Sequence, residues 1–189
     1  MWDRACHIQA EMFRETAALG GLEIQLCFYR GYAEFGYTPW YTESAALLKR
    51  MTSVFCLGGL TQLRKMLRHA IAEVKKGRVN ALIFVGDCVE EDTRELYALS
   101  GELALRNVPV FLFHEGHDAN AAAVFREIAR LTRGACCPFD ASSPKQLRDL
   151  LTAVAVYASG GREALTRFAR GRDALVASIA GQLSLPGKS

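Results

Sequence analysis

The sequence has 189 residues, of which 50% are hydrophobic and 23% are charged, and its formal net charge is only +3. This composition is typical of a single globular domain with a real hydrophobic core. A charge so close to neutrality gives no support for a nucleic-acid partner or an anionic membrane surface, and no apolar run approaches membrane-spanning length. We therefore expect neither nucleic acid nor membrane among the partners.

Six cysteines are spread along the chain, at positions 6, 27, 56, 88, 136 and 137. They form no Cys-x-x-Cys pair and have no neighbouring histidine at ligand spacing, so we expect core thiols in a reducing compartment. The first twenty or so residues are charged and amphipathic, unlike a signal peptide. A cytoplasmic location is the expectation that follows.

Hydrophobic periodicity predicts an alternation of helices and strands. A helix is expected at residues 2–17, then a strand at 22–30 and a more polar edge strand at 32–41, joined by a link so short that the pair must be antiparallel. The later elements are a helix at 42–51, a strand-like segment at 54–57, a helix at 62–76, a strand at 81–85, a helix at 91–106, a strand at 109–113, a helix at 120–133, a strand at 134–139, a helix from Ser142 or Ser143 to 158, and a final helix at 162–183.

From residue 60 onward helices and strands alternate regularly, which predicts βαβ crossovers and a parallel sheet. The expected fold class is α/β, with a doubly wound, mostly parallel sheet, one antiparallel edge strand, and helices on both faces. We assign residues 1–158 to one domain and residues 159–189 to a C-terminal amphipathic helix and tail. The apolar face of that helix could pack on the sheet's helices or dock on a partner.

The segment ALIFVGDCVEED, residues 81–92, is the most informative stretch. Its apolar run suits a strand buried on both faces, and it turns polar abruptly at Gly86 and Asp87. Open α/β sheets bind ligands at the carboxyl ends of their strands, which is where Asp87 would lie. The competing interpretation is that Asp87 caps the next helix, while Glu90, Glu91 and Asp92 form its acidic first turn.

This order of parts resembles the von Willebrand factor A (vWA) domain, a Rossmann-like fold. The segments LEIQLCFYRG and AEFGYTPWY resemble its second strand and antiparallel third strand. CLGGLTQLRKMLRHAI resembles its Gly-Gly-Thr loop and the following helix, with Leu60 inserted, and ALIFVGDCVEED resembles its fourth strand. VFREIARLTRGACCPFD resembles the helix that leads through a glycine into the last strand, so that the resemblance covers about residues 2–158.

The vWA resemblance implies a metal-ion-dependent adhesion site at the carboxyl ends of the strands. Two of its ligands carry over by motif, the threonine of the Gly-Gly-Thr loop as Thr61 and the aspartate after the fourth strand as Asp87. Hydroxyl and carboxylate oxygens suit Mg²⁺, or Ca²⁺ or Mn²⁺, and a partner's carboxylate fills the open position. The implied function is a non-catalytic module that binds another protein through the carboxyl-end face of the sheet.

The sequence departs from the vWA pattern in one large respect. It has no first strand and no Asp-x-Ser/Thr-x-Ser loop, so that two of five expected ligands are present and tight metal binding is not expected. The missing strand is the central one in the family's order 3-2-1-4-5-6, and unpaired ladder groups beside it would be costly. We therefore expect an N-terminally shortened version of a longer protein, from a late start codon, which translation of the upstream DNA would test.

Two alternative functions remain open. One is a small α/β enzyme, a metal-dependent hydrolase for example, that uses Asp87 with the loop from His114 to Asp118, in which His114, Glu115, His117 and Asp118 are candidate acid, base or ligand groups. That loop is also compatible with a plain solvated turn. The other is a structural scaffold or degenerate subunit. No dinucleotide fingerprint, Walker loop, G-x-S-x-G or H-E-x-x-H motif occurs.

Overall fold

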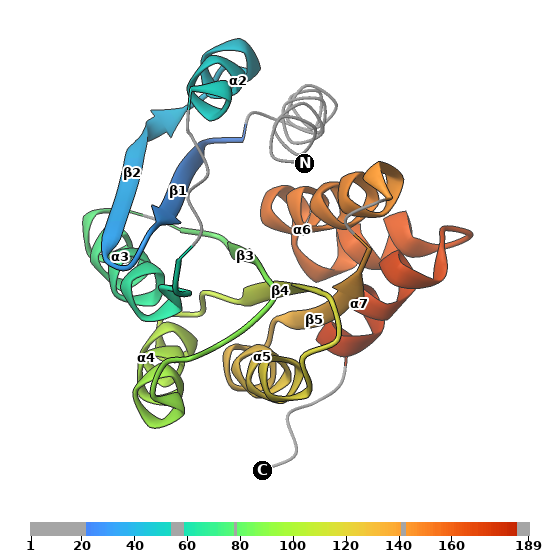
Figure 1. The fold of residues 1–189 in the computed structure, drawn as a ribbon. Coiled ribbons are helices and arrows are strands. Elements are labelled where there is room, and N and C mark those ends of the chain that lie inside the picture. Colours follow the sequence, from blue (N-terminus) through green and yellow to red (C-terminus); the bar gives the residue numbers. More distant parts are fainter. Residues whose placement is uncertain (1–21, 54–58, 78, 141–142, 185–189) are drawn as a thin grey trace. The chain divides into compact units, whose positions relative to one another are not determined.

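The computed structural model describes residues 22–53, 59–77, 79–140 and 143–184. The chain divides into two compact units, one formed by Met1–Gly59 with Asp140–Ala177 and the other by Leu60–Phe139 with Ser178–Ser189 (Figure 1). The helix predicted at residues 2–17 and the strand-like segment predicted at 54–57 lie outside the described residues.

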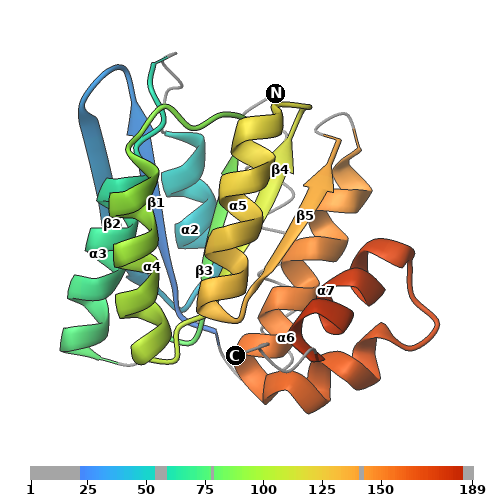
Figure 2. The ribbon, with the colours of Figure 1, turned by 90° about the horizontal axis from the view of Figure 1, so that it is seen from below.

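A three-stranded parallel sheet is the centre of the second unit. Its strands are β3 (Leu82–Gly86), β4 (Val110–Glu115) and β5 (Ala135–Phe139), in the order β3-β4-β5. Its helices are α3 (Leu63–Lys76), α4 (Thr93–Leu105) and α5 (Ala119–Thr132). The three helices lie side by side with α4 in the middle, and α5 packs on β4 and β5 (Figure 2).

Strand β4 is the most deeply buried part of this sheet. Its residues from Val110 to His114 are all buried, and the four apolar ones are fully inaccessible to solvent. A continuous apolar run of this kind is what a strand with a neighbour on each side requires. Helix α5 covers it with Phe125, which is also fully buried, so the core of the unit lies between α5 and the sheet.

At the connection between helix α5 and strand β5, the backbone of Gly134 lies very close to the backbone of β4. Arg133 ends the helix in the left-handed conformation with φ 58°, and Gly134 donates its N–H to the Ala129 carbonyl at 2.9 Å. A Cβ atom on Gly134 would lie 1.9 Å from the carbonyl oxygen of Val110. Glycine is therefore required here by contact with β4, which accounts for the glycine seen between helix and strand in the sequence.

The first unit contains an antiparallel hairpin of β1 (Ile24–Arg30) and β2 (Glu34–Tyr41), which confirms the predicted pairing. Gly31, with φ +57°, makes the turn, and the register shifts between Gln25 and Cys27. Helix α2 (Ser44–Thr52) follows, and its buried Leu47 packs with Leu22, Ile24, Leu26 and Tyr41.

The helices at the end of the chain differ from the prediction. Element α6 (Pro144–Ala169) consists of two helical segments that meet at a kink at Gly161, where φ is 70° and ψ is −165°, so the predicted break between residues 158 and 162 is confirmed. The predicted single helix at 162–183 is wrong, because the chain leaves the helix after Ala169 and α7 (Ala174–Ser184) begins a new one. Gly171, with φ +75°, allows the turn between them.

The predicted fold class is confirmed as mixed α/β with a parallel and an antiparallel part. The described strands form two sheets, β1-β2 and β3-β4-β5, which is the order expected for strands two and three and for strands four to six. In the described part of the chain, no helix combines the length and the apolar character needed to cross a membrane. The domain boundary at residue 158 remains a prediction.

Candidate functional site

The predicted site residues lie at one edge of the second unit, where the strands of the parallel sheet end. Asp87 directly follows β3 and is exposed, while Thr61 precedes α3 and is 5% exposed. The hydroxyl of Thr61 donates to the carbonyl oxygen of Cys88 at 2.9 Å, and its N–H donates to Glu90 Oε2 at 3.2 Å. Two hydrogen bonds thus fasten the Thr61 loop to the loop that carries Asp87.

Neither candidate ligand serves as a helix cap. The N-cap of α3 is Gln62, which makes no side-chain capping bond, and the N-cap of α4 is Asp92, which accepts from the Arg94 N–H at 2.9 Å. The Thr61 hydroxyl acts as a donor, so its oxygen lone pairs stay available to a ligand. The capping interpretation of Asp87 is therefore wrong, because Asp92 occupies the capping position.

Glu91 bonds the first turn of the preceding helix and Glu90 bonds the loop before it, whereas the sequence predicted both as first-turn acids of the following helix. Glu91 accepts from the Arg64 N–H at 3.1 and 3.2 Å, in the first turn of α3. The unpaired N–H groups at a helix N-terminus favour a carboxylate. Arg64 also pairs with Glu95 on α4 at 3.0 Å, so charged contacts hold α3 and α4 together beside the Asp87 loop.

Burial raises the pKa of Glu91, and its hydrogen bonds from Arg64 and Leu63 only partly offset this effect. The pKa in the folded protein is then above the unfolded value, so the stabilising contribution is present below the unfolded pKa and is lost as pH rises through the folded pKa. We expect the stability of Glu91→Gln relative to the wild type to increase between about pH 4 and pH 7. Urea unfolding across that range measures it.

Glu102→Gln is the matched control for the Glu91 experiment. Glu102 lies on α4 and forms an ion pair with Arg106 at the surface. Its stability relative to the wild type should not rise over the same pH range. A Glu91→Gln difference that is flat with pH, or that falls as pH rises, would show that burial does not control this carboxyl.

The exit loop of β4 does not gather its four candidate enzyme groups around one point. His114 is 4% exposed; its Nε2 lies 3.3 Å from the Asp87 carbonyl oxygen, and its ring meets Phe125 edge-on at 5.4 Å. Asp118 caps α5 by accepting from the Ala121 N–H at 2.6 Å. His117 is exposed and Glu115 is half-buried. His114 thus contacts the backbone of the Asp87 loop from β4.

Two further residues shape the Asp87 loop and were not singled out from the sequence. Asn120, in the first turn of α5, donates from Nδ2 to the Val89 carbonyl at 3.2 Å. The Cys88 thiol donates to Asp87 Oδ1 at 3.3 Å, and burial with the neighbouring acids raises the pKa of this thiol to about 11. The Asn120 contact joins residues 31 positions apart, and the Cys88 contact depends on side-chain orientation, so no spacing signal could have revealed either.

The potential metal ligands at this edge are chemically suited to a hard divalent cation but are few in number. Thr61 offers a hydroxyl oxygen and Asp87 a carboxylate, the ligand types that Mg²⁺ and Ca²⁺ prefer. Among the residues that the structure describes, no three histidine, cysteine, aspartate or glutamate side chains form a metal-binding group. Any ion here would need water or a partner's oxygen atoms to complete its coordination.

Comparison with solved structures identifies the fold. A von Willebrand factor type A protein from Catenulispora acidiphila superposes on 82% of this chain with a TM-score of 0.59 and 14% sequence identity. The chain has a vWA-like fold. It covers 39% of the length of that structure, and at this identity the similarity concerns the vWA-like fold alone. No protein-family model and no curated protein matches the sequence.

Proposed function

We propose that this chain is a non-catalytic protein-interaction module that binds its partner at the carboxyl-end edge of the parallel sheet, through a divalent ion held by Thr61 and Asp87. A vWA-like fold favours protein interaction in general terms, and open α/β sheets bind ligands at this edge. The partner would contribute a carboxylate. A cytoplasmic setting agrees with the cysteine content but is part of the proposal.

One observation carries the proposal more than any other. The Thr61 hydroxyl is bonded to the Cys88 carbonyl at 2.9 Å, next to an exposed Asp87. The hydroxyl and the carboxylate, which are 26 positions apart in the sequence, are thereby brought to adjoining loops. His114 and Asn120 hold the Asp87 loop from the side of β4 and α5. Such support reduces the ordering cost of binding.

A bound Mg²⁺ would supply a positive charge that attracts a carboxylate from the partner. The chain's own residues would do the rest. Asp87 would neutralise part of the charge, Thr61 would orient its oxygen toward the ion, and the Cys88 thiol would have to give up its bond to Asp87 Oδ1. The small number of protein ligands predicts weak affinity for the ion alone and stronger retention once a partner is bound.

The test is quantitative affinity capture from cells with the full chain as bait, compared with Asp87→Asn and with Glu102→Gln. Glu102 lies in the last turn of α4, away from the strand ends, and serves as the matched control. A partner of this edge should be retained by the wild type and the control in Mg²⁺, and lost at least about tenfold with Asp87→Asn or EDTA. Equal capture by all three proteins would contradict the proposal.

The alternatives have less support in the contacts of this edge. An enzyme would use His114, which is buried against Phe125, and Asp118, which is engaged as a helix cap. Metal-dependent turnover that is lost in His117→Ala would favour the enzyme. A degenerate scaffold would retain its partners in Asp87→Asn, so the same capture experiment separates it from the interaction module.

A further inference from the structure

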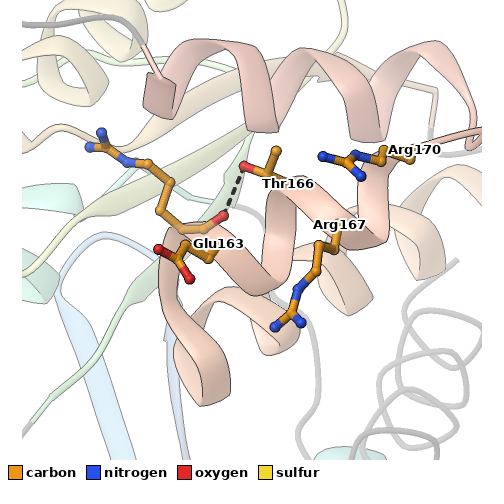
Figure 3. Close-up of a pocket in the computed structure, with 5 residues that line it drawn as sticks. Glu163, Thr166, Arg167 and Arg170 are labelled. Atoms are coloured by element: carbon orange, nitrogen blue, oxygen red, sulfur yellow. Dashed lines mark hydrogen bonds between the residues drawn. The ribbon is translucent and has the colours of Figure 1, made fainter.

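The second half of α6 carries a basic hollow that the proposed function does not use. Five residues line it, Arg162, Glu163, Thr166, Arg167 and Arg170, and its volume is about 340 Å³ (Figure 3). All five belong to the first unit, whereas Thr61 and Asp87 belong to the second. Its lining has three arginines and one glutamate, so the hollow has an excess of positive charge.

The three arginines of the hollow have no ion-pair partner in the part of the chain that the structure describes. Nearby acids are already engaged, because Lys145 pairs with both Asp149 and Asp173. Arg172, which follows the hollow, is also occupied, with its guanidinium 4.3 Å from the centre of the Phe168 ring. Among the described residues, no ion pair therefore balances the positive charge of the hollow.

Thr166 and Glu163 limit which ligands the hollow can bind. The Thr166 hydroxyl donates to the Arg162 carbonyl at 2.9 Å, so it presents no free donor and the guanidinium groups are the donors of the hollow. Glu163 is exposed and lies one turn before Arg167. A ligand must therefore place anionic groups at the arginines and an uncharged or basic group at Glu163.

The spacing of the arginines favours an extended ligand. Arg162, Thr166 and Arg170 follow one another at intervals of four residues, so they share one face of the helix. At 1.5 Å per residue the outer two are roughly 12 Å apart along the axis. A single phosphate is too small to bridge that distance, whereas carboxylates at alternate residues of an extended chain recur every ~7 Å.

We propose that this hollow binds an extended acidic segment of a protein partner. Arginine and carboxylate form paired, charge-assisted hydrogen bonds, which give both attraction and orientation. Glu163 sets the register by repelling an acid placed opposite it. The surface is independent of the Asp87 edge, so failure of either proposal leaves the other standing.

The probe is a fluorescent peptide of about nine residues with alternating glutamate and serine, long enough to span the arginines. Its binding to the full chain is measured by anisotropy at low ionic strength. The triple variant Arg162→Gln, Arg167→Gln, Arg170→Gln should bind about tenfold more weakly, because three exposed charge pairs are lost. Rising salt should weaken wild-type binding toward the level of the variant.

A second triple variant, Arg94→Gln, Arg126→Gln, Arg133→Gln, is the matched control. It removes the same charge from exposed arginines of the other unit and should bind within about twofold of the wild type. Glu163→Gln should tighten binding about twofold, because a like charge is removed. The glutamine-for-glutamate version of the peptide should not bind.

Three results would overturn the acidic-segment proposal. They are no binding of the peptide at millimolar concentration, equal weakening in both triple variants, and tighter binding of a single-stranded oligonucleotide than of the peptide. Exposed arginines contribute little to the core, so the far-ultraviolet circular dichroism of each variant should match that of the wild type, which excludes unfolding as a cause.

Discussion

Replacing Phe125 with alanine is expected to lower the free energy of unfolding by about 3–5 kcal/mol. Phe125 is fully buried on α5, and its ring packs edge-on against Phe84 at 5.5 Å and His114 at 5.4 Å. Truncation removes buried apolar surface and leaves a cavity between α5 and β4, which rigid secondary structure cannot fully close. Urea unfolding followed by circular dichroism measures the loss.

The Phe125 substitution should also loosen the candidate site. His114 would lose the ring that holds its imidazole, and the 3.3 Å contact of its Nε2 with the Asp87 carbonyl should weaken. Phe125→Leu is the control, because it keeps most of the buried volume and should cost less than half as much. A loss below about 1 kcal/mol for Phe125→Ala would mean that this ring is not central to the core.

Gly134→Ala is expected to destabilise the protein by about 3 kcal/mol or more. The new Cβ would lie 1.9 Å from the oxygen and 2.6 Å from the carbon of the Val110 carbonyl, which are backbone atoms of β4. A backbone neighbour cannot rotate away, so β4 and the end of α5 must move apart. That movement would also disturb the bond from the Val110 N–H to the Thr132 hydroxyl, now 3.1 Å.

The control for Gly134 is Gly101→Ala, in the interior of α4. A Cβ at Gly101 would meet nothing within 4 Å. Alanine favours the helix over glycine by up to about 1 kcal/mol, so this variant should be more stable than the wild type. Thermal unfolding of the two variants side by side gives the comparison. Equal midpoints for both would contradict the close approach of Gly134 to β4.

Most elements of the fold could be predicted because local pattern determines them. The apolar run before Gly86 predicted a strand at residues 81–85, and β3 spans Leu82–Gly86. The apolar residues spaced at helical intervals in KMLRHAI, residues 65–71, predicted a helix at 62–76, and α3 spans Leu63–Lys76. Parallel pairing followed from the alternation of helices and strands, since crossover connections permit little else.

The errors arose where one residue can serve two conformations or where contacts are distant in sequence. The break at Gly161 was predicted correctly, but Gly171 was expected to lie inside a helix at 162–183 and instead interrupts it. A single glycine is compatible with either outcome. Glu91 was assigned to the following helix, but its partner Arg64 is 27 residues earlier, and only the folded chain brings them together.

The candidate site was predictable in position but not in detail. Asp87 could be named because open α/β sheets bind ligands at the carboxyl ends of their strands, whereas Thr61 was named only through the resemblance of its loop to the Gly-Gly-Thr loop of vWA domains. The bonds that hold them, from Thr61 to Cys88 and from His114 to Asp87, depend on side-chain packing. Periodicity carries no information about such contacts, and a buried histidine has the same sequence signature as a catalytic one.

The central claim is tested most directly by paramagnetic line broadening with Mn²⁺, because it detects weak ion binding residue by residue. In nitrogen-15 spectra of the wild type, substoichiometric Mn²⁺ should broaden the amide signals of Thr61, Asp87 and Cys88 first, and excess Mg²⁺ should reverse the effect. Asp87→Asn should abolish this selectivity. Broadening spread over acidic surface residues, or unchanged in Asp87→Asn, would contradict a divalent ion at this edge.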